Sequence, residues 1–96
     1  MVDWIYEWDS AKDTANVKKH GYPLGLAILV FQDNNRTEVI DDRQDYGETR
    51  YLTYGLIDDR VFCACYTVRG NVRRIISFRT VHKKEKGRAY DNYQND

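Results

Sequence analysis

The sequence predicts an α+β fold: an N-terminal strand and two helices packed on a small antiparallel β-meander, followed by a C-terminal helix. Three observations predict this class. A segment with both helix caps lies near the N-terminus, an apolar run follows it, and strand-like segments joined by short turns fill the second half. With 96 residues, 42% of them hydrophobic, the chain can bury one modest core. We therefore expect a single domain, residues 1–96.

The first element is a strand and the second a helix. Residues 2–8 alternate large apolar and polar side chains, which is typical of a half-buried strand. Asp9 is a suitable N-cap for the helix formers of residues 10–20, whose last turn carries two lysines and a histidine. Gly21 then supplies a left-handed C-cap, so the helix is predicted to end there.

An apolar run covers residues 24–31, directly after Pro23. Its length and Ala27 favour a short buried helix, whereas its β-branched residues would also suit a buried strand, and Gly25 weakens a helix. We interpret it as the second helix. A turn and a short strand over residues 37–42 follow, opening a polar connection that ends near Gly47.

The second half contains three strand-like segments. They are separated by Asp58-Asp59 and by Arg69-Gly70-Asn71, short turns that predict an antiparallel meander. The middle segment is apolar on both faces, so we expect it to be the central strand, covered by helices on at least one side. Residues 82–96 are predicted to begin a C-terminal helix. The three segments are residues 49–57, 60–68 and 71–81.

The last of these strands carries three arginines. Because side chains alternate between the faces of a strand, Arg73 and Arg79 are predicted to share one face with Ile75 and Ser77, and Arg74 to lie on the other. Charge is also unevenly distributed along the chain. Residues 1–48 hold five Lys or Arg and ten Asp or Glu, and the second half reverses these numbers. The basic half could attract phosphate groups or form a solvated surface.

Cys63 and Cys65 are the only cysteines. Two residues apart on a strand, they are poorly placed for a disulfide, so we expect small buried thiols in a reducing compartment. His20 and His82 lack metal-ligand spacing, and neighbouring Asp pairs diverge in an extended chain, so no metal site is expected. No long apolar segment and no leader sequence is evident, which predicts a cytoplasmic protein without membrane contact.

Three segments together resemble the BrnT family of toxins. They are "YEWDSAKDTANVKKHG", "DDRQDYGETRYLTYG" with Gly47, Glu48, Arg50 and Gly55, and "RRIISFRTVHKKEK". The resemblance implies a RelE-like fold and a type II toxin that cleaves RNA and stops translation without a cofactor. It also implies a BrnA-like antitoxin partner, whose DNA-binding domain lets a hetero-oligomeric complex repress its own promoter.

Cleavage of RNA without a metal needs a base, an acid and cations that stabilise the phosphate. We predict Arg79 and Arg73 as the catalytic cations, His20 at the helix end as an acid, and Glu48 as a possible base. Each has a structural alternative. The arginines could pair with acidic groups of the first half, His20 could simply complete the helix end, and Glu48 could pair with Arg50.

Further basic side chains are expected to hold the substrate, and most tyrosines to pack in the core rather than stack on bases. The runner-up function is a non-catalytic module that binds RNA or pairs with an antitoxin in a DNA-binding repressor. One sheet face should carry the helices and the other the substrate, and the sequence leaves open which is which. The predicted substrate-binding residues are Lys19, Arg50, Arg74, Lys83 and Lys84.

Overall fold

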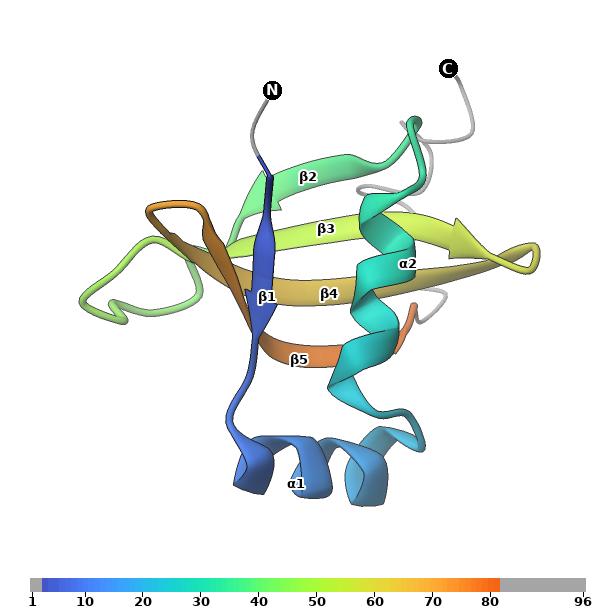
Figure 1. Ribbon diagram of the computed structural model, residues 1–96, viewed down its shortest axis with the longest axis horizontal. Coiled ribbons are helices and arrows are strands. Elements are labelled where there is room, and N and C mark those ends of the chain that lie inside the picture. Colours follow the sequence, from blue (N-terminus) through green and yellow to red (C-terminus); the bar gives the residue numbers. More distant parts are fainter. Residues whose placement is uncertain (1–2, 82–96) are drawn as a thin grey trace.

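The computed structural model describes residues 3–81 and shows an α+β fold with a five-stranded mixed sheet (Figure 1). The strands lie in the order β1-β5-β4-β3-β2, with β4 central as predicted. The predicted C-terminal helix lies outside the described residues. The elements are β1 (Ile5–Glu7), α1 (Ser10–His20), the 3₁₀ turn η1 (Leu24–Leu26), α2 (Ala27–Phe31), β2 (Thr37–Ile40), β3 (Tyr51–Ile57), β4 (Arg60–Arg69) and β5 (Val72–Thr80).

The prediction of a purely antiparallel sheet is wrong at one edge. Strands β3, β4 and β5 form the predicted meander and β2 adds to it antiparallel, but β1 pairs parallel with β5. Their pairing begins where the backbone N–H of Ile5 donates to the carbonyl of Asn71 at 2.9 Å. A short N-terminal strand carries no local signal for which distant strand it will join, since that choice is made by long-range packing.

Helix α1 has the predicted caps and lies along the outer edge of β5 (Figure 1). Asp9 accepts a hydrogen bond from the backbone of Lys12, and Gly21 ends the helix with φ at 86°. The buried Asn16 fixes the helix to the sheet: its amide donates to the carbonyls of Tyr22 and Phe78 at 2.8 Å, and its oxygen accepts from the Phe78 N–H at 3.1 Å. Asn16 thus pairs with the β5 backbone in place of another strand.

The apolar run of residues 24–31 is helical, as predicted, with η1 as its first turn. Gly25 is accounted for by close packing, because a Cβ at this position would lie 3.2 Å from the ring of Trp8. Helix α2 crosses one face of the sheet (Figure 1) and buries the main apolar core against it. We call this the helix face. The buried core residues are Leu24, Ala27, Val30, Phe62, Ala64, Tyr66, Ile75 and Phe78.

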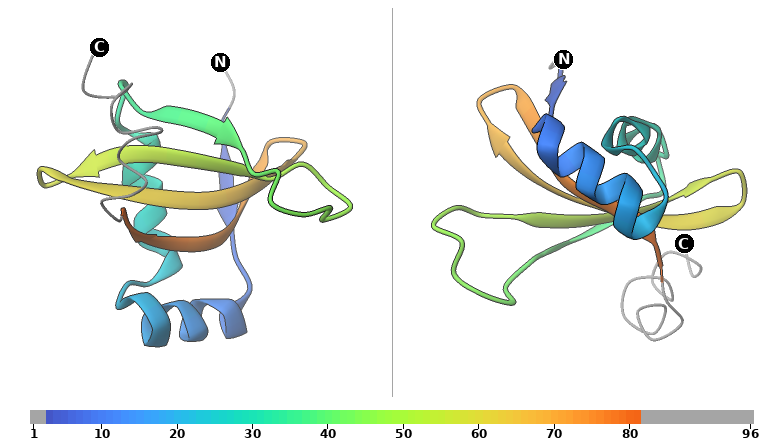
Figure 2. Two further views of the ribbon diagram at one scale, coloured as in Figure 1. Left: turned by 180° about the vertical axis from the view of Figure 1, so that it is seen from behind. Right: turned by 90° about the horizontal axis from the view of Figure 1, so that it is seen from below.

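The opposite face carries a second buried cluster of Tyr54, Val61 and Cys63, and neither α1 nor α2 covers it (Figure 2). We call it the open face. Cys65 also lies there, and both cysteine side chains are buried, as predicted, with no disulfide between them. Within the described residues, no helix is long and apolar enough to span a membrane.

A β-bulge interrupts the alternation of β5. Cys65 of β4 pairs with Ser77, but the next residue of β4, Tyr66, pairs with Ile75, so Ile76 has no partner across the strand pair. Arg79 therefore lies on the open face opposite Cys63. The prediction that Arg73 and Arg79 share a face is wrong for this reason.

Candidate functional site

The open face gathers arginines from three neighbouring strands. Arg50 immediately precedes β3, Arg69 ends β4, and Arg74 and Arg79 lie on β5. The strand register places Arg69, Arg74 and Arg79 on the face of the buried cysteines, and the alternation of β3, extended by one residue, places Arg50 there too. Guanidinium groups carried by adjacent rigid strands are well suited to holding a polyanion, since each can donate two parallel hydrogen bonds to a phosphate.

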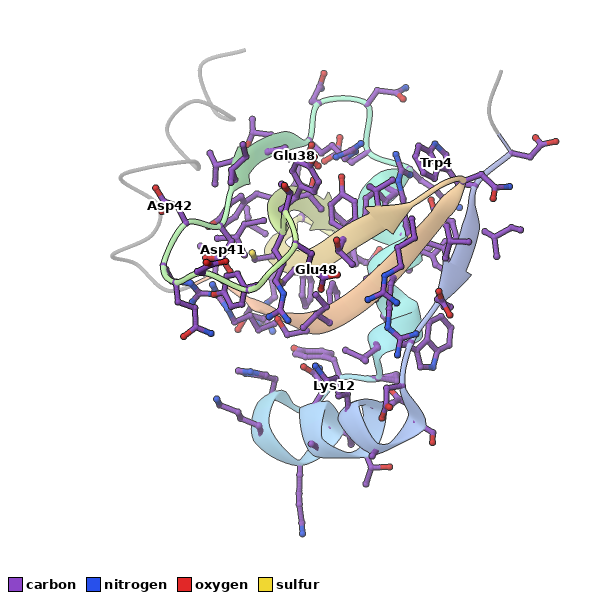
Figure 3. All side chains as sticks on the ribbon, turned by 90° about the vertical axis from the view of Figure 1, so that its left-hand side faces the viewer. Trp4, Lys12, Glu38, Asp41, Asp42 and Glu48 are labelled. Atoms are coloured by element: carbon purple, nitrogen blue, oxygen red, sulfur yellow. The ribbon has the colours of Figure 1, made fainter. Side chains whose placement is uncertain are left out.

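Glu48 lies among these arginines, in the loop that joins β2 to β3 (Figure 3). Its carboxylate accepts a hydrogen bond from Arg69 at 3.1 Å and lies 3.6 Å from Nε of Arg50. The hydrogen bond from Arg69 lowers the pKa of Glu48, with further lowering by the charge of Arg50. The ion pair with Arg50 considered from the sequence is therefore present, and Glu48 stays ionised at neutral pH.

Three guanidinium groups act on the buried thiol of Cys65. Burial raises the pKa of this thiol to about 11, and the nearby carboxylate of Asp41 raises it further. The charges of Arg50, Arg43 and Arg79 oppose that rise. Arg79 and Arg50, predicted for catalysis and substrate binding respectively, lie on the same face of the sheet as this thiol.

The loop beside this thiol is built on Asp41, whose side chain is 1% exposed. Arg43 donates to both of its carboxylate oxygens at 2.7 and 2.8 Å, and Tyr46 donates its hydroxyl at 3.0 Å. The hydrogen bonds from Arg43 lower the pKa of Asp41 to about 2. Arg50 in turn stacks on the ring of Tyr46, with its Cζ atom 4.0 Å from the ring centre.

The end of α1 reaches the edge of the open face. A shallow hollow of about 240 Å³ lies between the helix and β5 and is lined by Lys12, Lys19, His20 and Ser77. Lys19 and His20 were predicted as site residues, but Lys12 was missed; it lies on the side of α1 that faces the sheet (Figure 3). The signal that could have found Lys12 is helical spacing, because residues seven and eight positions apart share a helix face.

Arg73 lies on the helix face, away from the other predicted cations. Its guanidinium is 4.1 Å from the ring centre of Trp4 and 4.3 Å from that of Phe31, and it donates to the hydroxyl of Tyr6 at 2.9 Å. Arg74 is on the open face but pairs with Glu7 of the adjacent β1 at 3.0 Å. The structure therefore groups Arg79 with Arg50, Arg69 and Arg74, and separates Arg73 from them.

The remaining predicted residues have mixed outcomes. Tyr54 and Tyr66 are buried and Tyr51 packs on Tyr66, as expected for core tyrosines. Lys83 and Lys84 lie outside the described residues.

Arg69 was not predicted as a site residue. The alternation of β4 could have found it, because Arg69 is an even number of positions from Cys63 and Cys65 and so lies on their face. Among residues 3–81 no three His, Cys, Asp or Glu side chains gather as a metal site would require.

Comparison with known proteins identifies the family. The model of a family described as the ribonuclease toxin, BrnT, of type II toxin-antitoxin systems matches residues 8–85. That match includes both helices, all of the sheet from β2 to β5 and every open-face arginine named above. No match is found among curated proteins. The chain belongs to the BrnT family of ribonuclease toxins of type II toxin-antitoxin systems.

Proposed function

We propose that the open face binds the RNA backbone and cleaves it without a metal ion, and that this cleavage inhibits translation. The observation that carries the proposal is the convergence of Arg50, Arg69, Arg74 and Arg79 on one face of a toxin of this family. The hollow lined by Lys12, Lys19 and His20 extends the cationic surface beside β5, which suits a chain of several phosphates rather than one.

The proposed reaction is an internal transfer of the phosphate. The ribose 2′-oxygen loses its proton and bonds to the adjacent phosphorus, the bond to the 5′-oxygen of the next nucleotide breaks, and that oxygen takes up a proton. The products are a 2′,3′-cyclic phosphate and a 5′-hydroxyl end. Arg79 and Arg50 stabilise the charge that builds on the phosphate oxygens. The ionised Glu48 accepts the first proton, and His20 supplies the second.

Incubation with RNA tests this proposal directly. The wild-type protein should cleave RNA in the presence of EDTA and leave cyclic phosphate ends, whereas Arg79→Ala should cleave about 100-fold more slowly. Arg60→Ala is the matched control, because Arg60 is an exposed arginine whose partner, Tyr22, packs in the core of the helix face. Equal cleavage by the two variants would contradict the assignment of the open face.

The alternative is a silent module that binds RNA or only pairs with its antitoxin. A type II toxin has an antitoxin partner, and we propose a BrnA-like protein with a DNA-binding domain. Growth arrest on expression of the chain alone, relieved by co-expression of that protein and absent with Arg79→Ala, supports the nuclease. RNA binding without cleavage by the wild-type protein supports the silent module.

A further inference from the structure

The Arg50 side chain contacts the ring of Tyr46 and lies beside the carboxylate of Glu48. Its guanidinium lies 4.0 Å from the ring centre of Tyr46, and its Nε atom is 3.6 Å from a carboxylate oxygen of Glu48. That Nε is buried and makes no hydrogen bond within the described residues. Contact with a ring holds a guanidinium across its flat face and leaves its N–H edge available for two oxygens of a phosphate. The ring therefore determines where this edge lies.

Tyr46 is itself fixed by Asp41. The tyrosine hydroxyl donates to Asp41 at 3.0 Å, and burial together with this hydrogen bond raises the pKa of Tyr46, so the hydroxyl remains a donor at neutral pH. Asp41 also binds the other end of the loop, because its backbone N–H donates to the carbonyl of Arg50 at 2.8 Å. One buried residue thus fixes both the backbone of Arg50 and the ring beneath its side chain.

We propose that Tyr46 is a positioning residue for Arg50, held in place by Asp41, and that this loop sets the affinity of the open face for the RNA phosphate. The inference rests on the proposed function for its RNA part, but the stacking of Arg50 on Tyr46 does not depend on cleavage. No role was predicted for Tyr46 from the sequence, where the segment is simply a polar connection.

Two substitutions separate the ring from its hydroxyl. Tyr46→Leu removes the ring that supports Arg50, whereas Tyr46→Phe keeps the ring and loses only the bond to Asp41. Tyr46 is half-buried, and neither change touches the two hydrogen bonds from the Arg43 side chain to Asp41, so both variants should fold. Trp4→Leu is the matched control, because Trp4 supports Arg73 in the same way on the helix face.

The first measurement is the NMR resonance of the Arg50 Nε–Hε group, which senses the ring current of Tyr46. It should move to the position of an unstacked arginine in Tyr46→Leu, move part of the way in Tyr46→Phe, where Asp41 no longer fixes the ring, and remain unchanged in Trp4→Leu. An unchanged Arg50 resonance in Tyr46→Leu would overturn the inference.

The second measurement is affinity for an RNA made uncleavable by 2′-deoxy nucleotides. Tyr46→Leu should weaken binding about fivefold in the wild-type background and have no further effect when combined with Arg50→Ala. Equal weakening in both backgrounds would show that Tyr46 does not act through Arg50, and would also overturn the inference. Neither measurement needs cleavage. A wild-type protein that does not cleave RNA would therefore contradict the ribonuclease proposal but not the role of Tyr46.

Discussion

Arg73 and Arg79 lie on the same strand, β5, but on opposite faces of the sheet, because the unpaired Ile76 between them reverses the alternation. Arg73 is packed among aromatic rings on the helix face, and Arg79 lies on the open face opposite Cys63. The two arginines are therefore expected to differ in function, although the sequence presents them as equivalents.

Substitution of each arginine should separate activity from stability. Arg79→Ala is expected to reduce RNA cleavage about 100-fold, since it removes charge stabilisation at the phosphate, with little effect on unfolding. Arg73→Ala should instead lower the free energy of unfolding by about 1–2 kcal/mol through the loss of its ring contacts. Cleavage assays and urea unfolding measure the two effects. The opposite pattern would place the site on the helix face.

Glu48→Gln tests the proposed base. The change removes a negative charge that faces Arg50 and Arg69, so binding of uncleavable RNA should be equal or tighter. Loss of the proton acceptor should nevertheless reduce the maximal cleavage rate about 100-fold. Single-turnover kinetics at saturating protein separate the two quantities. An unchanged maximal rate would leave Glu48 as an ion-pair partner only.

The free energy of unfolding should depend on pH through the ionisation of Asp41. Its folded-state pKa of about 2 lies below the ordinary value of 3.8, so its stabilisation is complete above about pH 4 and is lost as pH falls toward 2. Asp41→Asn, which breaks the Arg43 pair, is expected to cost about 2 kcal/mol at pH 7. Urea unfolding of both proteins between pH 7 and 2.5 should show this difference shrinking in acid. A constant difference would contradict the assignment.

Asn16 should be indispensable for attaching α1 to the sheet. Asn16→Ala removes three hydrogen bonds with backbone groups, two of them with the buried Phe78 and one with Tyr22, which is expected to cost about 2–4 kcal/mol. Asn16→Asp should also destabilise, because a carboxylate would face two carbonyl oxygens. Hydrogen exchange at the Phe78 amide provides a local measurement: it should accelerate in both variants, and normal protection there would show that the contact is dispensable.

The cysteines should be unreactive in the folded protein. Both thiols are buried, and the pKa of Cys65 is about 11, so very little thiolate is present at pH 8. A neutral thiol reagent is expected to modify them only after urea unfolding, at the rate of an ordinary cysteine. Rapid modification of the native protein would show that the open face unfolds locally.

Local patterns predicted much of the fold. The caps of α1 at Asp9 and Gly21 and the doubly buried β4 follow from side-chain chemistry and periodicity, which act over a few residues. The turn at Asp58 and Asp59 was predicted too, and both residues adopt positive φ there. These features need no knowledge of distant contacts.

The features that escaped prediction depend on long-range pairing. The strand that pairs with β1 is determined by packing between distant parts of the chain. The bulge at Ile76 has no signal in the sequence, because isoleucine suits either face of a strand. The role of Asp41 was hidden for a similar reason: its burial depends on a loop that folds back to β3. The sequence identified Arg79, Arg50 and Glu48 as candidates. Only the strand register of the structure shows that they share a face from which Arg73 is excluded.

The bulge also affects how relatives of this chain should be compared. Beyond Ile76, odd and even positions of β5 exchange their surroundings, so counting alternate residues from the Gly70 turn assigns the wrong environment to everything that follows. A relative of the same length whose strand passed this point without a bulge would present its last arginine to the hydrophobic interior, whereas a relative that lacked Ile76 would keep that arginine on the open face by regular alternation. Alignment of this strand should therefore be anchored at the irregularity and not at the turn.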